Sequence, residues 1–307
     1  MRNRTLLFSL FLVLAALAGQ AQTDTLPKAL LWRIDAPDAP APSYLFGTIH
    51  LIGAEDFLLS DSLMSALNRT ETVTFEIDPA DMKNPATAMQ LMMKAFMRGD
   101  TTLRDLVSEE EYAQVDAHFS ELGLPMMFLD RVKPMFLSML AGMDGMDFSG
   151  MMGGEGGAES DIKSYEFEID AVARASDKTV SGLETVDFQM GLFDSIPYRA
   201  QAQMLLEAID TSNAGNQSNQ LEELTKIYVS GDVDGMFAMS VGEDGGVGGF
   251  ERMLITNRNR NWIEPIKMAV AERPTLFAVG AGHLGGPEGV VRLLRAEGFT
   301  LTPLSVR

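Results

Sequence analysis

Residues 44–51 read Tyr-Leu-Phe-Gly-Thr-Ile-His-Leu, a short apolar run that ends in a Gly-x-x-His motif. A similar run, Leu-Phe-Ala-Val-Gly-Ala-Gly-His-Leu, occupies residues 276–284 near the other end of the chain. The chain has 307 residues but only 3 histidines, and His50 and His283 stand in these two runs. Short apolar runs that are bounded by turn residues are typical of buried strands. The two runs therefore predict two strands, each of which leads through a glycine to a histidine.

The first run opens a predicted strand–helix–strand unit. Residues 44–49 form its first strand, a helix capped by Ser60 follows over about 61–68, and residues 72–78 form its second strand. A strand, a helix and a strand at this spacing make a βαβ unit. We therefore expect the two strands to be parallel and adjacent.

The end of the chain repeats this order. Residues 275–279 predict a strand, 288–297 a helix and 299–304 a final strand. Between the two halves the apolar spacing is mostly helical, so we expect a large helical insertion over about 85–160. The expected fold class is α/β (α+β), with a central, mostly parallel sheet built from the two βαβ-like halves at the chain ends.

The middle of the chain supplies further helices and two glycine-rich segments. A capping box at Ser108 predicts the start of one helix, and a long amphipathic helix is expected over 250–272. Residues 211–219 have the composition of a polar linker. Residues 142–157 and 242–249 predict flexible loops, either a lid or disorder. Two further strands are expected, at 26–34 and 179–184.

Residues 1–21 are typical of an export signal. Two arginines precede an apolar stretch over 6–18, and small residues at 19–21 offer a cleavage position. The stretch is short for a membrane span, which needs roughly 20 apolar residues. We therefore expect residues 22–307 to form a single mature domain without a stable membrane span, exported to a periplasm or outside the cell.

Composition excludes several classes of function. The chain has no cysteine, which excludes disulfides, thiolate metal ligands and cysteine nucleophiles. A net charge of −19 argues against nucleic acid and anionic lipid as partners. The 21 methionines predict flexible packing of the core, with an adaptable apolar groove as the less favoured alternative.

Potential metal ligands follow several of the predicted strands. His50 and His283 come after the two apolar runs, and Glu76 and Glu184 end two other strand-like segments. The carboxyl ends of parallel strands share one edge of a sheet, and ligands bind in the crevice there. Neighbouring strands lie about 4.8 Å apart, so imidazole and carboxylate groups can meet at one ion. The sequence therefore predicts four potential ligands around one crevice.

Structural roles are the alternative for each of these residues. A single histidine is more often a hydrogen-bonded core residue than a ligand. Glu76 alone would be an ordinary carboxylate at a strand edge, and Glu184 alone would cap the following helix. The pairing of His50 with His283 favours a functional site, whereas His118 lies in a charged helical stretch and is assigned no role.

Five motifs resemble, in the same order, those of the TraB/GumN family, which includes the Tiki and pheromone-shutdown proteins. They are the run at 44–51, Phe-Glu-Ile-Asp at 75–78, Gly-Leu-Glu-Thr at 182–185, Arg-Asn-x-x-Trp at 258–262 and Val-Gly-Ala-Gly-His-Leu at 279–284. The likeness spans nearly the whole mature chain. The Tiki branch acts as metal-dependent proteases, so the resemblance implies metal-site roles for His50, Glu76 and His283.

A mechanism follows as a hypothesis. A divalent ion (manganese, cobalt and zinc are left open) polarises a carbonyl and lowers the pKa of water. One of Glu76 and Glu184 acts as general base and the other as ligand. Arg258 is expected to hold a substrate carboxylate or a developing oxyanion, with a surface or helix-dipole charge as its alternative, and Asn259 to orient it.

Two glycines complete the predicted site. Gly47 and Gly280 each stand three residues before a histidine. A glycine there permits a tight exit from the strand or a close approach of a ligand to the backbone. We therefore expect both glycines to lie against the bound substrate.

The predicted function is that of an exported metal-dependent hydrolase, most specifically a peptidase, which acts on a peptide or small-molecule substrate. The alternative is a non-catalytic protein that sequesters a peptide or small ligand in the same crevice. Serine catalysis is disfavoured because the chain has no Gly-x-Ser-x-Gly elbow. Residues 280–285 resemble a dinucleotide motif but lack its final position and the acidic residue on a second strand. The substrate and the oligomeric state are left open.

Overall fold

The structure is a computed structural model that describes residues 25–141, 162–210, 214–241, 250 and 252–306. The predicted export signal (1–21) and the predicted glycine-rich loops (142–157 and 242–249) lie outside the described residues. Among the helices of the described residues, none is both long and apolar enough to cross a membrane.

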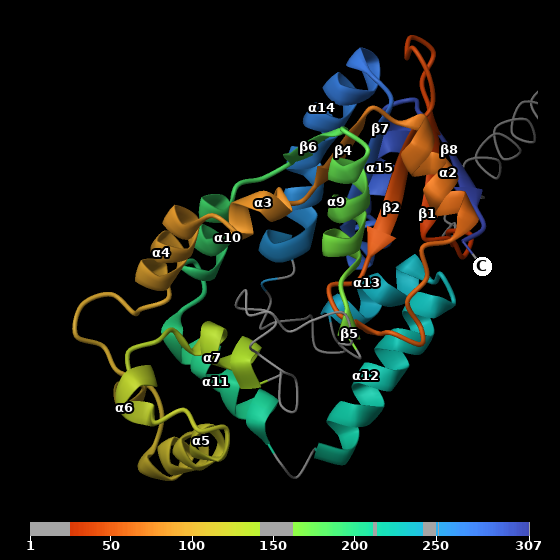
Figure 1. Ribbon diagram of the computed structural model, residues 1–307. Coiled ribbons are helices and arrows are strands. Elements are labelled where there is room, and N and C mark those ends of the chain that lie inside the picture. The colour runs from red at the N-terminus through yellow and green to blue at the C-terminus, as the bar shows by residue number, and fades with distance from the viewer. Residues whose placement is uncertain (1–24, 142–161, 211–213, 242–249, 251, 307) are drawn as a thin grey trace, which may run out of the picture.

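Six strands form the main sheet, in the order β6-β4-β7-β2-β1-β8 (Figure 1). Their bounds are β1 Leu31–Asp35, β2 Ser43–Thr48, β4 Thr72–Phe75, β6 Thr179–Gly182, β7 Thr275–Gly280 and β8 Thr300–Leu304. The pairs β6–β4, β4–β7 and β7–β2 are parallel, whereas β1 is antiparallel to β2 and to β8. Strands from both chain ends therefore build one mostly parallel sheet, as predicted. A separate pair joins β3 (Ile52–Gly53) to β5 (Ile162–Lys163).

The two halves of the sheet are interleaved, which the sequence did not predict. Strands β2 and β4 are parallel, but β7 lies between them: Gly47 is opposite Val279, and Phe75 is opposite Ala278. The prediction that β2 and β4 are adjacent is therefore wrong. The physical reason is that β7 is an apolar strand with five of its six residues buried, and the central position buries it on both faces.

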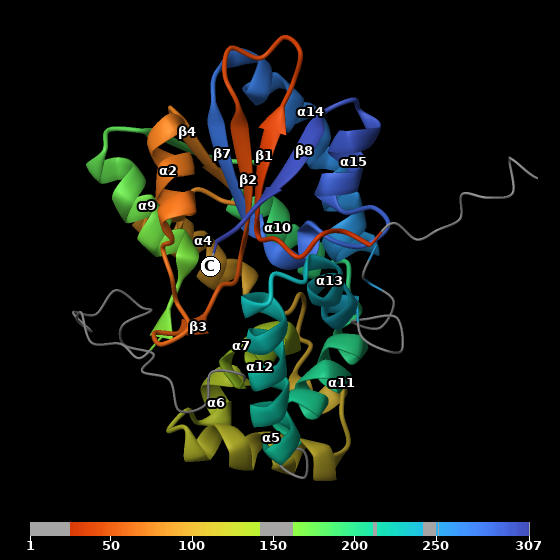
Figure 2. The ribbon, with the colours of Figure 1, turned by 90° about the vertical axis from the view of Figure 1, so that its right-hand side faces the viewer.

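Helices cover both faces of the sheet, as Figure 2 shows. Helices α2 (Asp61–Arg69) and α9 (Tyr165–Ala175) lie on one face, and α14 (Asn257–Glu272) and α15 (Val290–Ala296) on the other. The chain leaves β2 toward α2 and leaves β7 toward α15, so the connections of these adjacent strands diverge to opposite faces. The carboxyl ends of β2 and β7 are therefore the point where the topology switches, which is where ligands bind in open α/β sheets.

A helical arm extends from the sheet, at the lower left of Figure 1. The helices outside the sheet layers are α3 Pro79–Met82, α4 Pro85–Lys94, α5 Glu109–Glu121, α6 Met126–Leu129, α7 Pro134–Ala141, α10 Val186–Phe193, α11 Tyr198–Ile209, α12 Ala214–Val229 and α13 Val233–Val241. The expected helical middle of the chain is confirmed. These helices have a hydrophobic cluster of their own, which includes Val115, Phe119 and Leu137. Leu205 of α11 also belongs to this cluster, although α11 lies beyond the predicted insertion.

Helix boundaries follow the local chemistry. Ser60 caps α2 and Ser108 caps α5 with a full capping box, as predicted. The predicted linker at 211–219 is wrong for its described part, because α12 begins at Ala214. Once the apolar run after position 220 nucleates this helix, adding one polar residue at a time costs little. The predicted helix over 250–272 begins instead as a π-helical turn, Arg252–Thr256, which leads into α14.

Candidate active site

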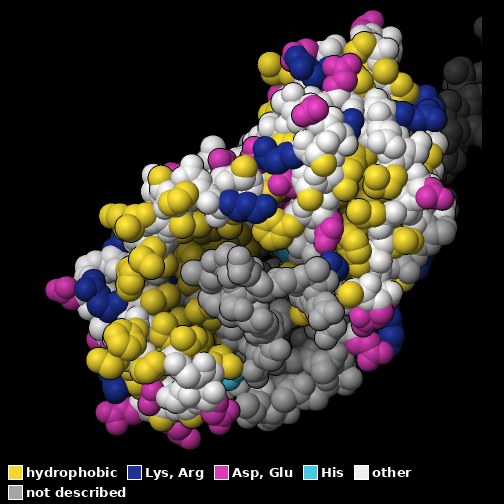
Figure 3. Space-filling view, viewed as in Figure 1, with side chains coloured by type: hydrophobic (Ala, Val, Ile, Leu, Met, Phe, Trp, Pro, Cys, Tyr) yellow, Lys and Arg dark blue, Asp and Glu magenta, His cyan; other side chains and the backbone are white. Residues whose placement is uncertain are grey.

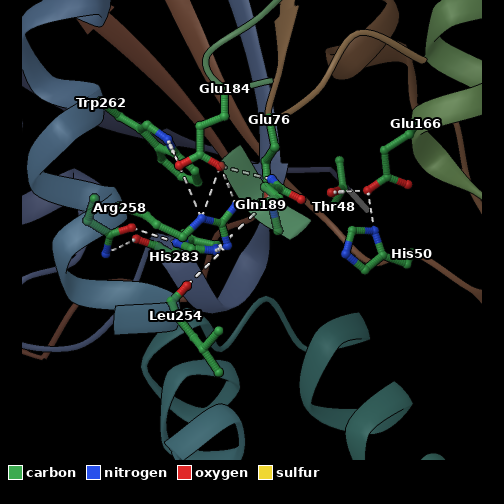
Figure 4. A network of polar contacts seen from close by, with 12 residues as sticks. Thr48, His50, Glu76, Glu166, Glu184, Gln189, Leu254, Arg258, Trp262 and His283 are labelled. Atoms are coloured by element: carbon green, nitrogen blue, oxygen red, sulfur yellow. Dashed lines mark hydrogen bonds and ion pairs between the residues drawn. The ribbon is translucent and has the colours of Figure 1, made fainter. Parts of the chain in front are cut away.

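Glu76 and Glu184 lie side by side because the ladder between β4 and β6 continues past the ends of both strands. The amide of Leu183 donates to the carbonyl of Phe75, and the amide of Glu184 donates to the carbonyl of Glu76, each at 2.8 Å. The side chain of Gln189 on α10 joins the two carboxylates, with Nε2 at 3.2 Å from Glu76 Oε2 and 2.9 Å from Glu184 Oε2. The predicted juxtaposition of these two glutamates at one sheet edge is thus observed (Figure 4).

Arg258, in the first turn of α14, binds both carboxylates. Its Nη2 lies 2.5 Å from Glu76 Oε2 and 2.9 Å from Glu184 Oε2, and its Nε lies 3.0 Å from Glu184 Oε2. Its Nη1 donates to the carbonyl of Leu254 at 3.0 Å, within the π-helical turn, and contacts His283 Nε2 at 3.2 Å. An arginine has five N–H donors in a fixed fork, and these contacts engage all three guanidinium nitrogens. Arg258 is buried, so it is neither a surface charge nor free to bind a ligand without releasing one of these partners.

Glu184 is held on every side. Besides Arg258 and Gln189, the indole Nε1 of Trp262 donates to its Oε1 at 2.9 Å. The side chain is 5% exposed. A carboxylate so enclosed positions its neighbours; it does not face solvent, and this arrangement favours a supporting role for Glu184 over that of general base.

His283 is buried and its orientation is fixed by Asn259. The imidazole Nδ1 lies 2.6 Å from Asn259 Oδ1, while the amide of Asn259 donates from Nδ2 to the carbonyls of His283 and Glu288. Since the guanidinium of Arg258 can only donate, Nε2 of His283 accepts and Nδ1 carries the proton. Trp262 packs against the ring, with centroids 4.5 Å apart. Asn259 therefore orients the histidine, rather than Arg258 as the sequence suggested.

Burial and charge set the protonation of this pair. Burial lowers the pKa of His283 to about 4, against the attraction of the Glu76 carboxylate, so the imidazole is neutral at neutral pH. Burial alone would raise the pKa of Glu76, but the positive charge of Arg258 and the hydrogen bond from the amide of Gly280 hold that pKa well below its usual range. Glu76 is therefore an ionised carboxylate, and its Oε1 lies 3.8 Å from Nε2 of His283.

His50 has a different environment, although its motif is the same. Its side chain is 78% exposed, against 6% for His283. Its Nδ1 lies 3.0 Å from Oε1 of Glu166, which also accepts from Thr48 Oγ1 at 2.7 Å. The hydrogen bond to Glu166 and the negative charges of Glu166 and Glu76 raise the pKa of His50 above its usual range. Figure 4 shows His50 on the side of Thr48 and Glu166, apart from Arg258 and His283.

Two residues of the site were not found from the sequence. Glu166 is 116 residues from His50 and stands among ordinary acidic residues in the first turn of α9. Gln189 lies 113 residues from Glu76, on the exposed helix α10. Neither carries a motif, and a first-turn glutamate is expected in any helix because it opposes the helix dipole. Only the folded chain brings them to the crevice.

The two glycines of the Gly-x-x-His motifs form hydrogen bonds with other residues of the chain. Gly280 donates from its amide to Glu76 Oε1 at 2.8 Å, and a Cβ at this position would stand 3.2 Å from the same oxygen. Gly47 donates to the carbonyl of Leu30 and accepts from the hydroxyl of Tyr228. A Cβ on Gly47 would stand 3.1 Å from Ala281. Both glycines thus permit close packing around the histidines, and their contact with substrate stays a prediction.

The donor chemistry of the site fits a divalent ion, but the donor side chains are too far apart to bind one ion together. Within the described residues, no three His, Asp or Glu side chains come together closely enough to hold a metal ion. Both histidines nevertheless have Nδ1 bound to an oxygen acceptor, so Nε2 is the nitrogen that would bind a metal, as is usual around metal-bound histidine. In His283 this nitrogen accepts a hydrogen bond from Arg258. Glu76 adds an ionised carboxylate. A shared ion would require His50 to approach this carboxylate and Arg258 to release Nε2 of His283.

Comparisons with known proteins identify the family of the chain. The sequence model of the TraB/PrgY/gumN family matches residues 30–303, which contain both Gly-x-x-His motifs and the carboxylate cluster. A relative from Amphimedon queenslandica, named "Metalloprotease TIKI homolog", is 22% identical over 355 aligned positions, which cover 99% of this chain and 67% of the relative. No solved structure matches the chain significantly.

Proposed function

Because the chain belongs to the TraB/PrgY/gumN family, we propose that it is a metal-dependent hydrolase, and specifically a peptidase, that uses His50, Glu76 and His283. The distant relative that is named a metalloprotease supports this class of reaction. The observation that carries the proposal is that the two histidines occupy equivalent positions in the sheet and make equivalent contacts through Nδ1. Each follows a parallel strand at the switch point of the sheet, and each presents Nε2 because an oxygen atom holds its Nδ1.

The ion of the proposal is divalent, with manganese, cobalt and zinc all compatible with nitrogen and carboxylate donors. When bound, it supplies Lewis acidity, which polarises a carbonyl and acidifies water. Within the chain, Glu76 is the ionised carboxylate that binds a cation or accepts a proton. Gln189 and Arg258 hold Glu76 in place, and Asn259 fixes the His283 ring with Nε2 on the side of Arg258 and Glu76.

The surface beside the site supports a peptide with apolar side chains as the substrate. Met89, Met92 and Met93 on α4 are 60%, 62% and 71% exposed, so the prediction that the methionines pack the core is wrong for these three. Figure 3 shows hydrophobic side chains gathered on the helical arm. Helix α4 is joined to α10 by the ion pair Lys94–Asp187. Since α10 also carries Gln189 of the site, α10 links α4 to the carboxylate cluster. Flexible methionines suit binding of varied apolar side chains.

The proposal also includes export, on the evidence of residues 1–21. Cell fractionation, followed by N-terminal sequencing of the exported protein, checks it. A chain that stays in the cytoplasm with residue 1 still in place would contradict export, although it would leave the hydrolase proposal intact.

The experiment for the proposed activity combines metal analysis with peptide cleavage. The purified protein is expected to contain a divalent metal, and His50→Ala and His283→Ala to lose most of it, whereas the control His118→Ala keeps it. Cleavage of apolar peptides is expected to stop with a chelator and to return when the metal is restored. Unchanged metal content in both site variants would contradict the proposal.

A non-catalytic function in the same crevice is the second candidate. Arg258 engages the carboxylates and His283 with all its nitrogens, so these side chains are bound to one another, as in a protein that only holds its ligand. Such a sequestering protein would bind peptide with the same affinity with and without chelator and would release it uncleaved. The cleavage assay above therefore separates the two functions.

A further inference from the structure

Glu166 is held rigidly at the start of α9. Its neighbour Tyr165 is 3% exposed and packs edge-on against Phe46 of β2, with ring centroids 5.4 Å apart. The Tyr165 ring also contacts Phe57 at 4.6 Å and Tyr228 at 5.8 Å. This aromatic cluster fixes the first turn of α9 against the sheet, so the backbone of Glu166 is positioned by the core and not by the exposed surface.

The carboxylate of Glu166 is bound on both oxygens. Oε1 accepts from the hydroxyl of Thr48 at 2.7 Å and from Nδ1 of His50 at 3.0 Å. Oε2 accepts from the hydroxyl of Ser164 at 2.9 Å. The Thr48 residue is 1% exposed and the Glu166 side chain 19%. The two hydroxyls fix the orientation of the carboxylate, and Oε1 offers its second lone pair to His50 (Figure 4).

The two histidines of the site differ in what holds them. His283 is enclosed by Asn259, Arg258 and the ring of Trp262. His50 is largely exposed, so packing constrains its ring weakly. A hydrogen bond from Nδ1 to a carboxylate fixes both the tautomer and the direction of the ring, and directs Nε2 to the opposite side.

We infer that Glu166 is the positioning residue for His50: through the Thr48–Glu166–His50 contact it keeps Nε2 of His50 directed into the crevice. The inference deepens the proposed function and rests on it, because His50 is there a metal-binding residue. Glu166 acts through His50 and touches neither the ion nor the substrate.

The test compares Glu166→Gln with a matched control, Glu168→Gln. Glu168 is on the same helix two residues on and pairs with the partly exposed Lys163, at 3.2 Å. Calorimetric titration with Mn²⁺ alone and with Zn²⁺ alone is expected to show a 10- to 100-fold weaker affinity for Glu166→Gln, the usual effect of losing such a partner. Glu168→Gln is expected to bind as the wild type does. A loss of unfolding temperature in Glu166→Gln with unchanged metal affinity would mean a purely structural role and would overturn the inference.

Two further measurements keep the inference separate from the proposed function. In protein labelled with ¹⁵N-histidine and free of metal, the imidazole nitrogens of His50 are expected to shift in Glu166→Gln, while those of His283 stay unchanged. If the wild type binds no metal, the proposed function fails and this spectrum alone decides the role of Glu166; an unshifted His50 overturns it. If Glu166→Gln does not fold, Thr48→Val replaces it. This variant removes the hydroxyl at 2.7 Å from Oε1 and is expected to shift the same His50 signals, with an unshifted spectrum again overturning the inference.

Discussion

Nη2 of Arg258 lies 2.5 Å from Oε2 of Glu76, although 182 residues separate the two along the chain. The same guanidinium binds Glu184 and contacts His283. One buried cation thus pairs with two carboxylates at the switch point of the sheet. Taking charges out of water is costly, so each of these groups depends on the others for its burial.

Replacing Arg258 by methionine tests this dependence. The variant leaves Glu76 and Glu184 buried without their cation, and we expect the free energy of unfolding to fall by about 3–5 kcal/mol. Urea denaturation measures it. The control is Arg260→Met, two residues along the same helix, where an exposed pair with Glu288 is lost and less than about 1 kcal/mol is expected. Equal losses of unfolding free energy in the two variants would show that the burial of the two carboxylates does not depend on Arg258.

Replacing Asn259 by leucine tests the orientation of His283. The variant removes the acceptor at 2.6 Å from Nδ1 and the donor to two carbonyls. We expect metal affinity to fall about 10- to 100-fold, and stability to fall by about 1–3 kcal/mol because buried polar groups lose their partners. Asn261→Leu, at an exposed position of the same helix, is the control and should change neither. Metal affinity that survives in Asn259→Leu would contradict a positioning role.

Much of this site could be predicted from the sequence, but its geometry could not. The apolar runs before His50 and His283 identify two buried strands, and the strand ends locate Glu76 and Glu184 at the same edge. Hydrophobic pattern says nothing about strand order, however, so the position of β7 between β2 and β4 was missed. The same pattern also predicted equivalent environments for His50 and His283.

The two histidines differ because the chain leaves the two strands differently. After β7 it folds at once into a short 3-10 helix, Ala281–His283, which buries the second histidine. After β2 it bends outward toward β3 and leaves His50 exposed. The partner of His50, Glu166, comes from a distant helix whose contact with β2 depends on tertiary packing. Such contacts leave no trace in local spacing, which is why the sequence predicted the donors and not the residues that orient them.

Acid is expected to weaken the link between the first described residues and the C-terminal half. Asp234 accepts from the amides of Leu26 and Gly286 and from Arg292. Burial opposes its ionisation, but these donors lower the pKa of Asp234 to about 2. A carboxylate whose folded pKa lies below its unfolded value of about 3.9 contributes stability above that value and loses it as the pH falls toward the folded pKa.

The variant Asp234→Asn makes this measurable. It should be less stable than the wild type near pH 7, and the difference should close as the pH falls from about 4 to about 2. Chemical denaturation at a series of pH values follows the difference. Asp116→Asn, at an exposed position of α5, controls for the general effect of charge. A difference between Asp234→Asn and the wild type that is independent of pH would mean that ionisation of Asp234 is not what stabilises this contact.

The apolar surface of α4 gives the last prediction. Met92 and Met93 are 62% and 71% exposed and pack against little of the protein, so replacing both by serine should leave the unfolding temperature within about 2 °C, since exposed substitutions change stability by less than about 0.5 kcal/mol. If this surface receives the apolar side chains of a substrate, burial of two methionines contributes about 1.5–3 kcal/mol each at most, and the double variant should bind apolar peptides at least 10-fold more weakly. The measurement is KM with kcat for a peptide series of rising hydropathy, in which KM rises and kcat is unchanged. Met268→Ser is the control, because Met268 is also exposed, at 72%. It lies near the C-terminal end of α14, close to the start of β7, whereas the site lies at the other end of β7. A double variant whose KM is unchanged over the whole series would exclude α4 from substrate binding.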